Sequence, residues 1–238
     1  MSLYRDGGIV LRTHKLAEAD RIVVFLTRDH GKVRAVAKGI RKTKSRFGGR
    51  LEPPAHVELL FYAGRNLDVV TQVETVDAFG AVRHDFDRLT RAISMLEAVD
   101  QVALEGEPNP ALYRMLLGAL GALASHDTPM VVPAFFFKLL ALEGYGPQVE
   151  ECTVCGTSSD LVAWAIETGG LRCRAHRQGN PISPEAVAVV RRILGGQLGA
   201  ALSEPPSAAT AEVDRLALRV LEHHLERRLK SVSSLPRV

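Results

Sequence analysis

The sequence has few cysteines, few aromatic residues and no long apolar run. Three cysteines and one tryptophan occur in 238 residues, and aromatic residues make up 5% of the chain. The longest apolar stretches, such as residues 131–142, are interrupted by Pro133 and Lys138 and are too short to span a bilayer. The N-terminal residues lack the apolar core and the small-residue cleavage site of a signal peptide. We therefore expect a cytoplasmic globular protein without a membrane-spanning segment.

The cysteines are too few and too clustered for a disulfide framework. All three fall between residues 152 and 173, and an odd number would leave one thiol unpaired. They form the pattern Cys152-Thr-Val-Cys155, which is followed after seventeen residues by Cys173-Arg-Ala-His176. Gly156 allows a tight turn after the first pair, and Gly169-Gly170 lead into the second. Such spacing is typical of two metal-binding knuckles.

The four side chains of these knuckles predict a structural zinc site. Each knuckle chelates an ion with two ligands from one tight turn, and thiolate and imidazole ligands suit tetrahedral zinc. Four protein ligands leave no coordination position open, so the site would be structural and not catalytic. We expect one zinc ion per chain, with the ligands Cys152, Cys155, Cys173 and His176. The alternative is three buried thiols beside a surface histidine.

A second metal pattern resembles that of the zinc deaminases. His56-Val57-Glu58 precedes Cys152-Thr-Val-Cys155, and in deaminases a histidine ligates zinc while the glutamate transfers protons. However, His56 lies in an expected strand, Glu151 replaces the proline before the first cysteine, and the second knuckle would have no role. We therefore favour the structural site. The sequence contains no visible nucleophile–base pair or nucleotide-binding motif, so we do not expect an enzyme.

Positive charge is concentrated in one short segment. The net charge is +3, but residues 1–80 carry 14 Lys and Arg against 9 Asp and Glu, whereas the remainder carries 16 against 18. Nine of the basic residues fall within residues 28–50, where Asp29 is the only acidic residue. Such asymmetry predicts a polyanionic partner for the N-terminal part of the chain.

The first eighty residues are predicted to form strands. Apolar and β-branched residues are enriched in five short segments, residues 7–14, 20–28, 32–37, 56–62 and 67–76. Asp29-His30-Gly31 and residues 63–66 connect two pairs of these segments as hairpins. In the last strand one face is expected to carry Leu67, Val69, Thr71, Val73 and Thr75. This pattern fits a small barrel of the oligonucleotide/oligosaccharide-binding (OB) type, and another small barrel or a β-sandwich is the alternative.

Beyond Phe79 the apolar period changes to that of helices. Helices are expected over residues 83–105, 111–124, 134–142 and 208–230. A further helix is expected to begin at Pro184 with Ser183 as its N-cap. We interpret the chain as a multi-domain α+β protein, with an OB-fold β-barrel domain in residues 1–80 and an α-helical domain in residues 81–238. A zinc-knuckle segment, residues 150–178, is inserted in the helical domain.

The connection between the third and fourth strands is the most basic part of the chain. Residues 38–50 contain six cations, no acidic residue, and both glycine and serine. A flexible cationic loop can follow a phosphate backbone and release its counterions, so nucleic acid is the expected partner. We expect DNA contacts from Lys32, Arg34, Lys38, Arg41, Lys42, Lys44, Arg46 and Arg50.

Two alternatives stay open for this nucleic-acid surface. Phe47, within the loop, can either stack on a base or be buried in the barrel. The arginines of the zinc segment, Arg172, Arg174 and Arg177, can carry the binding instead of the loop. In either case phosphates require only charge, so we expect binding that is nearly independent of base sequence.

Several segments, in the same order, resemble the bacterial RecO family of recombination mediators. In the N-terminal part these are Gly8-Ile9-Val10-Leu11-Arg12, Glu18-Ala19-Asp20-Arg21-Ile22, Leu26-Thr27-Arg28-Asp29-His30-Gly31-Lys32 and Ala37-Lys38-Gly39-Ile40-Arg41. In the remainder they are Leu142-Glu143-Gly144-Tyr145-Gly146-Pro147, the first knuckle with Gly156, Gly169-Gly170-Leu171-Arg172-Cys173, and Lys230-Ser231 with Leu235. His176 stands where many members of the family have a fourth cysteine. Because some members lack the site, the resemblance implies that zinc serves stability.

This resemblance implies both a fold and a function. The fold is an OB domain that binds single- and double-stranded DNA, followed by a helical domain with the zinc knuckles. The function is DNA repair and recombination, through annealing of complementary strands and loading of the RecA recombinase onto DNA coated by single-strand-binding protein. The implied partners are DNA, RecR and the acidic tail of single-strand-binding protein, with a cytoplasmic, nucleoid-associated location. The alternative is an RNA-binding OB protein of translation or RNA processing.

Overall fold

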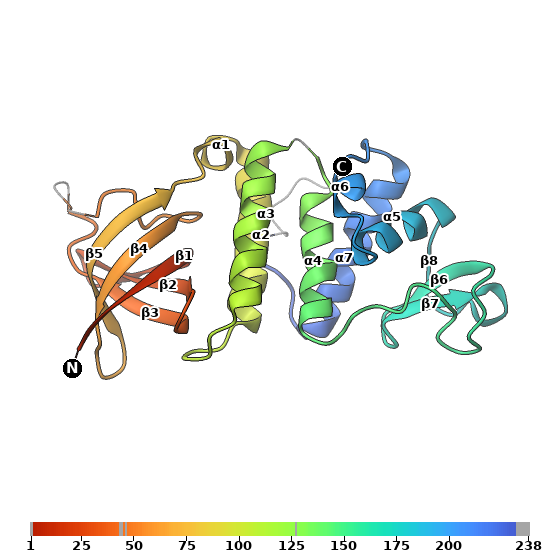
Figure 1. The fold of residues 1–238 in the computed structure, drawn as a ribbon, viewed down its shortest axis with the longest axis horizontal. Helices are drawn as coiled ribbons and strands as arrows, with labels where there is room; N and C mark the ends of the chain where they lie inside the picture. The colour runs from red at the N-terminus through yellow and green to blue at the C-terminus, as the bar shows by residue number, and fades with distance from the viewer. Residues whose placement is uncertain (1, 43–44, 46, 127, 232–238) are drawn as a thin grey trace. The chain divides into compact units, whose positions relative to one another are not determined.

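The structure, a computed structural model, describes residues 2–42, 45, 47–126 and 128–231. The chain folds into two compact units: unit 1 runs to Ser125 and also includes the segment that begins at Leu229, and unit 2 extends from His126 to Arg228. Unit 1 combines a barrel with helices, and unit 2 combines helices with a small sheet (Figure 1). The expected α+β class is therefore confirmed. Strands give way to helices near residue 80, whereas the compact units divide later in the chain.

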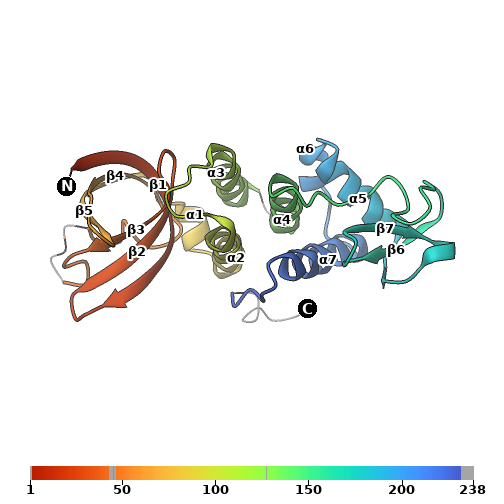
Figure 2. The same cartoon turned by 90° about the horizontal axis from the view of Figure 1, so that it is seen from below.

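Unit 1 contains a closed barrel. Its strands are β1 (Leu3–Leu16), β2 (Asp20–Thr27), β3 (Gly31–Ala37), β4 (His56–Tyr62) and β5 (Asp68–Asp77). Their order around the barrel is β1-β2-β3-β5-β4, and β4 pairs with β1. All of these pairings are antiparallel apart from the short parallel pair of β3 and β5. Figure 2 shows the strands wound around the interior. The OB-type barrel expected from the strand spacing is confirmed.

The barrel core is filled by side chains that alternate along the strands. In β3, for example, Val33, Ala35 and Ala37 are buried, because successive residues of a strand point to opposite faces. The β2–β3 hairpin requires glycine at Gly31, which has φ of 68°. A Cβ at Gly31 would also lie 2.3 Å from the backbone carbonyl oxygen of Glu107. This close approach of the backbone at Glu107 is a second reason why the position needs glycine.

One expectation for β5 is wrong. The sequence pattern assigns one face to Leu67, Val69, Thr71, Val73 and Thr75. In the structure, however, Val70 is fully buried in the barrel core. The register with β4 shifts between Val70 and Gln72, which leaves Thr71 as an extra residue in the strand. Such a bulge exchanges the two faces of a strand, so the core face carries Val70 before the bulge and Val73 after it, and Val69 does not share the face of Val73.

Helices α1 (Gly80–Arg83), α2 (Phe86–Val102) and α3 (Pro110–Ser125) follow the barrel in unit 1. The α2 helix packs on β1 and on α3 (Figure 1). It begins later than the sequence pattern predicts, because the side chain of Asp85 accepts a hydrogen bond from the N–H of Arg88 and caps the helix there. Phe86 is the first helical residue and is 70% exposed.

The segment that follows unit 2 returns to α2. Leu229 is buried, and the carboxylate of Glu97 accepts hydrogen bonds from the N–H of Lys230 at 3.0 Å and from the N–H of Ser231 at 2.9 Å. The hydroxyl of Ser231 donates to the same carboxylate at 2.6 Å. Burial raises the pKa of Glu97, but these bonds and the Lys230 charge lower it by more, so the pKa lies below its usual value.

Unit 2 contains the helices α4 (Val131–Leu142), α5 (Pro184–Leu194), α6 (Leu198–Leu202) and α7 (Ala208–His224), and α4, α5 and α7 pack against one another. Ser183 caps α5 by accepting a hydrogen bond from Ala186, with Pro184 in the first turn, as the sequence predicts. A capping box of Ser207 and Thr210 begins α7, which ends at His224 and therefore before the expected residue 230. Among the described residues, none of the helices has the length and apolar content needed to cross a membrane.

A small sheet in unit 2, which the sequence pattern did not predict, carries the second knuckle. Its strands are β6 (Leu161–Ala165), β7 (Gly170–Cys173) and β8 (Asn180–Pro181), in the order β7-β6-β8. Trp164 of β6 is fully buried, and its ring centroid lies 5.8 Å from that of Phe137 in α4. This aromatic contact anchors the sheet to the helices of the unit.

Candidate metal centre and nucleic-acid interface

The first knuckle is a turn held by backbone hydrogen bonds. The N–H of Cys152 donates to the carbonyl of Thr157 at 2.8 Å, and the N–H of Gly156 donates to the carbonyl of Cys152 at 2.9 Å. Gly156 has φ of 70°, a conformation that favours glycine. The N–H of Thr153 donates to the carbonyl of Leu171 at 2.9 Å, so the turn is fixed to β7.

The second knuckle begins where β7 ends. Cys173 is the last residue of β7 and pairs with Leu161 of β6, and a 3-10 turn, Arg174–His176, follows it directly. This turn brings His176 back beside Cys173. The approach of the first knuckle to β7 is close, because a Cβ at Gly170 would lie 2.7 Å from the carbonyl oxygen of Gln148. Gly170 is therefore needed for the two knuckles to meet.

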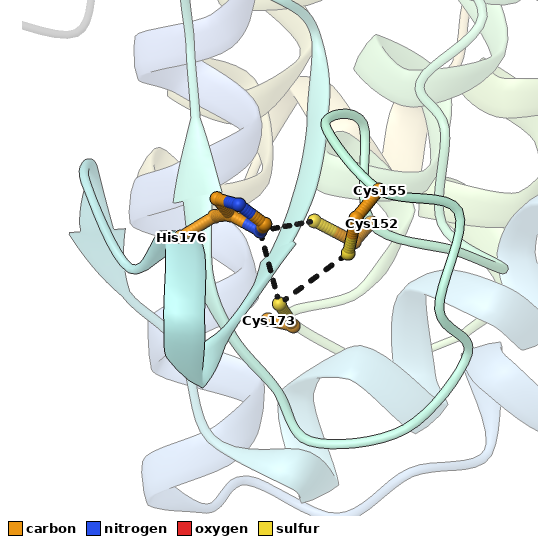
Figure 3. Close-up of side chains that lie close together, drawn as sticks. All are labelled: Cys152, Cys155, Cys173 and His176. Carbon is orange, nitrogen blue, oxygen red and sulfur yellow. Dashed lines mark hydrogen bonds between the residues drawn. The ribbon is translucent and has the colours of Figure 1, made fainter.

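The two knuckles bring together the four side chains that the sequence predicts as metal ligands: Cys152, Cys155, Cys173 and His176 (Figure 3). Their ligand atoms all lie within 4.8 Å of one another. Nδ1 of His176 is 3.4 Å from Sγ of Cys173 and 3.8 Å from Sγ of Cys152. Sγ of Cys155 is 3.8 Å from Sγ of Cys173.

These separations fit a tetrahedral metal ion. Bonds of about 2.3 Å to sulfur and about 2.0 Å to nitrogen give tetrahedral edges of about 3.8 Å between two sulfurs and about 3.5 Å between sulfur and nitrogen. The observed distances of 3.4 to 3.8 Å agree with both edges. The residues can therefore bind one metal ion, and the cluster expected from the spacing of the motif is confirmed.

The thiols of the cluster differ in their surroundings. Cys152 and Cys173 are buried, whereas Cys155 is exposed. Burial raises the pKa of the Cys152 thiol, but backbone N–H groups of Cys173, Val154 and Cys155 stabilise the thiolate and bring its pKa down to about 6. The thiolate is the form of cysteine that binds metals, so the knuckle backbone favours metal binding.

The structure favours the four-ligand site over the deaminase-like alternative. His56 and Glu58 lie in β4 of the barrel, and the cluster formed by the cysteines includes neither of them. Nε2 of His56 instead lies 2.9 Å from the hydroxyl of Tyr113 in α3. Cys173 and His176, which have no role in the deaminase pattern, complete the cluster with Cys152 and Cys155.

The basic loop between β3 and β4 is attached to the barrel by apolar side chains. Ile40, Phe47 and Leu51 are 7%, 1% and 0% exposed and belong to the barrel core. The hypothesis that Phe47 stacks on a base is therefore wrong, and the alternative of burial in the barrel is confirmed. These buried side chains attach the loop to the barrel at three points, and they thereby limit the positions that its basic residues can take on the barrel surface.

The beginning of the loop is also held by polar contacts with the β1–β2 hairpin. The N–H of Gly39 donates to the carboxylate of Asp20 at 2.7 Å, and the N–H of Arg41 donates to the carbonyl of Ala19 at 3.0 Å. Nη1 of Arg41 donates to the carbonyl of Glu18 at 2.8 Å. Arg41 is thus oriented by a neutral acceptor, and no carboxylate of the described residues forms an ion pair with its guanidinium.

Several of the cations expected to contact DNA are exposed on this loop. Lys38, Lys42 and Arg50 are exposed. In the part of the chain that the structure describes, no carboxylate pairs with the ammonium group of Lys38 or of Lys42. Lys44 and Arg46, which the sequence also predicts as contacts, lie outside the described residues.

The two cations of β3 have acidic partners within the protein. Nζ of Lys32 donates to the backbone carbonyl of Asp100 at 2.8 Å and lies 3.8 Å from its carboxylate, and the Lys32 side chain is 16% exposed. Nη1 of Arg34 lies 3.7 Å from the carboxylate of Glu105, and both of these side chains are substantially exposed. A phosphate would have to compete with these carboxylates, most strongly at Lys32, because a buried ion pair is costly to break.

One further cation beside the loop was missed by the sequence interpretation. Nη1 of Arg83 in α1 donates to the carbonyl of Gly49 at 3.4 Å. The two residues are 34 positions apart and belong to different elements, so neither periodicity nor the local density of charge indicates the contact. Arg83 therefore adds a positive charge at the end of the basic loop.

Comparisons with known proteins agree with these features along the whole chain. A family model described as "Recombination protein O N terminal" matches residues 1–79, which include the barrel, and one described as "Recombination protein O C terminal" matches residues 83–233, which include the metal cluster. A protein of Bifidobacterium adolescentis named "DNA repair protein RecO" is 44% identical over 245 aligned positions, covering 99% of this chain and 100% of that protein. The chain therefore belongs to the RecO family.

Proposed function

We propose that the chain is a DNA-binding recombination mediator that acts in DNA repair. Its family and the name of its relative from Bifidobacterium adolescentis support this function. The observation that carries the proposal is the exposed pair Lys38 and Lys42 on the barrel loop, which has no carboxylate partner within the described residues. Uncompensated cations on a small barrel suit the phosphates of a nucleic-acid strand.

The proposed contacts are made to phosphates and not to base edges. Phosphates require only positive charge, which the lysines and the arginines of the loop both supply, whereas reading a base edge requires side chains held in a fixed orientation. The proposed contact set is Lys32, Arg34, Lys38, Arg41, Lys42, Lys44, Arg46 and Arg50. Within it, Lys32 and Arg34 would have to exchange a carboxylate for a phosphate. We therefore expect binding of both single- and double-stranded DNA that depends strongly on salt and little on sequence.

The mediator role follows from phosphate binding together with family membership. Cations that neutralise phosphates reduce the repulsion between two complementary strands, which supports strand annealing. Loading of the RecA recombinase onto DNA coated by single-strand-binding protein, with RecR and the acidic tail of single-strand-binding protein as partners, is proposed from the family. These are binding functions, and we propose no chemical step for the chain.

We further propose that the metal is zinc and that its role is structural. Three thiols and one imidazole form a donor set that suits zinc, and four protein ligands would close its coordination sphere. When bound, zinc would supply a cross-link between two short segments that have little apolar core of their own. Cys152 and Cys155 would hold it from the first knuckle, and Cys173 and His176 from the end of β7.

Salt-dependent binding of labelled single-stranded DNA tests the DNA interface. Each phosphate contact contributes about 0.7 to the slope of log affinity against log salt on single strands. Lys38→Ala with Lys42→Ala should therefore reduce the slope by about 1.4. The charge-matched control is Arg114→Ala with Lys138→Ala, on α3 and α4, and should keep the wild-type slope. If the loop variant and the control give the same slope, the loop does not bind the phosphates.

Competition between DNA and RNA separates the proposal from its alternative. An RNA-binding OB protein would use the same cationic loop, so the slope alone does not distinguish the two functions. Unlabelled single-stranded DNA and RNA of the same sequence should be titrated against the labelled DNA complex. We expect DNA to compete at least as well as RNA. Clear preference for RNA would favour the alternative in translation or RNA processing.

Metal analysis of the purified protein tests the zinc site. Protein purified without a chelator should contain one equivalent of zinc per chain. Cys152→Ser should lower both the zinc content and the melting temperature. Ser158→Ala, an exposed change in the same segment, is the matched control and should alter neither quantity. Zinc far below one equivalent in the wild-type protein would refute the assignment.

A further inference from the structure

The turn between β7 and β8 in unit 2 is fixed by a close backbone approach. Gly179 has φ of 135°, and a Cβ there would lie 2.3 Å from the carbonyl oxygen of Trp164. The next residue, Asn180, pairs with Trp164 in the small sheet. Since Trp164 is fully buried, the turn is attached to the core of the unit and its orientation is set.

Two arginines from different elements bond to this turn through neutral acceptors. Nη1 of Arg172, in β7, donates to the backbone carbonyl of Gln178 at 3.2 Å and lies 3.4 Å from its side-chain oxygen. Nη1 of Arg219, in α7, donates to the side-chain oxygen of Asn180 at 2.6 Å. Amide and carbonyl oxygens orient these guanidinium groups without neutralising them.

Two more arginines extend the same surface. Arg177 is exposed and immediately precedes Gln178 in the turn. Arg215 is exposed and lies four residues before Arg219, so the two occupy the same face of α7. Among the residues that the structure describes, no acceptor bonds to the side chain of Arg177 or of Arg215.

Two acidic residues of unit 2 near this surface make polar contacts of their own. Glu212, one turn before Arg215, accepts hydrogen bonds from the N–H and the hydroxyl of Ser183 at 3.0 and 2.6 Å. Asp160 lies 3.8 Å from the guanidinium of Arg174. The neutral donors of Ser183 leave Glu212 charged, so Glu212 and the neighbouring Asp214 offset two of the four arginine charges, and the surface keeps an excess of positive charge. In contrast, Arg192 of α5 in the same unit is paired with a carboxylate at 2.5 Å.

We infer that Arg172, Arg177, Arg215 and Arg219 form a second phosphate-binding surface, on unit 2 and separate from the barrel loop. Guanidinium groups bind phosphate oxygens through paired, charge-assisted hydrogen bonds. Here they are held by oriented neutral acceptors, so a phosphate backbone meets them without displacing a carboxylate. That the polyanion is DNA rests on the proposed function. With one phosphate-binding surface in each unit, a single chain can hold two strands during annealing.

The salt dependence of binding to single-stranded DNA tests this surface directly. The triple variant Arg177→Ala, Arg215→Ala and Arg219→Ala should reduce the log–log slope by about two, since each lost phosphate contact removes about 0.7. The charge-matched control is Arg114→Ala, Lys138→Ala and Arg228→Ala, whose residues lie outside the turn and the α7 face, and it should keep the wild-type slope. An equal slope for the triple variant and this control would overturn the inference.

A second variant distinguishes loss of phosphate contacts from loss of folding. Arg177→Gln with Arg215→Gln removes two exposed charges that make no bond within the described residues, so zinc content and melting temperature should stay at wild-type values. Its slope should still fall by about 1.4. A wild-type slope for this variant would refute the second surface. The variant of Lys38 and Lys42 reports on the barrel loop separately, so failure of the proposed function and failure of this inference give different results.

Discussion

Phe47 offers a sharp test of how the basic loop is built, because two roles for this residue predict opposite results. The side chain is 1% exposed and lies in the barrel core with Ile40 and Leu51, although it sits within the most basic segment of the chain. Truncation of a buried phenylalanine to alanine costs about 3–5 kcal/mol, from lost burial and the cavity that is left. We therefore expect Phe47→Ala to destabilise the barrel by about that amount.

Unfolding by urea, followed in parallel with DNA binding, separates the two roles. Phe47→Leu keeps most of the apolar volume and should cost less than about 1.5 kcal/mol, while it removes the aromatic face. If Phe47 is a core residue, this variant binds DNA with wild-type affinity. If Phe47 stacks on a base, the variant loses about 1–3 kcal/mol of binding, roughly fivefold to 150-fold in affinity. Wild-type unfolding of Phe47→Ala combined with weak DNA binding of Phe47→Leu would refute the packing described above.

Three further outcomes follow from particular contacts. Gly170→Ala should destabilise unit 2 by about 1–3 kcal/mol and lower its zinc content, because the new Cβ meets backbone at 2.7 Å, whereas Gly199→Ala, which meets nothing within 4 Å, should change neither. Lys32→Met should lower the free energy of unfolding, measured with urea, by about 1–3 kcal/mol, since its ammonium is engaged with Asp100. A lowered pKa of Glu97 contributes stability that is present above its unfolded pKa and is lost as the pH falls through the folded value. Glu97→Gln should accordingly destabilise the protein at neutral pH and progressively less as the pH falls through the folded pKa of Glu97, and an equal effect at every pH would contradict this.

Much of the barrel could be predicted from the sequence, because the bounds of its strands depend on neighbouring residues in the chain. Strands β2, β3 and β4 match the expected segments to within a residue at each end, since β-branched runs are bounded by turn residues such as Gly31. The face of β5 could not be predicted in this way. The extra residue Thr71 reverses the alternation, and a bulge is specified by pairing with β4 and not by the strand itself.

The metal cluster could also be predicted, whereas its supporting sheet could not. Cysteine spacing defines a chelating turn by itself, so the four ligands are recognisable without a fold. Strands as short as β7 and β8 leave little periodic pattern, and the close contact of Gly170 with Gln148 joins residues more than twenty positions apart. The role of Phe47 likewise depended on tertiary packing, because a phenylalanine among cations has the same local sequence whether it is buried or exposed.

The return of the chain to unit 1 has a consequence for folding during synthesis on the ribosome. The carboxylate of Glu97 receives its partners from Lys230 and Ser231, and Leu229 is buried in the same unit. All of unit 2 must therefore be translated before unit 1 can be completed. Until residue 231 has left the ribosome, the carboxylate of Glu97 lacks these hydrogen-bond donors and the apolar site of Leu229 stays exposed. Chaperones would therefore have most access to the chain during this interval.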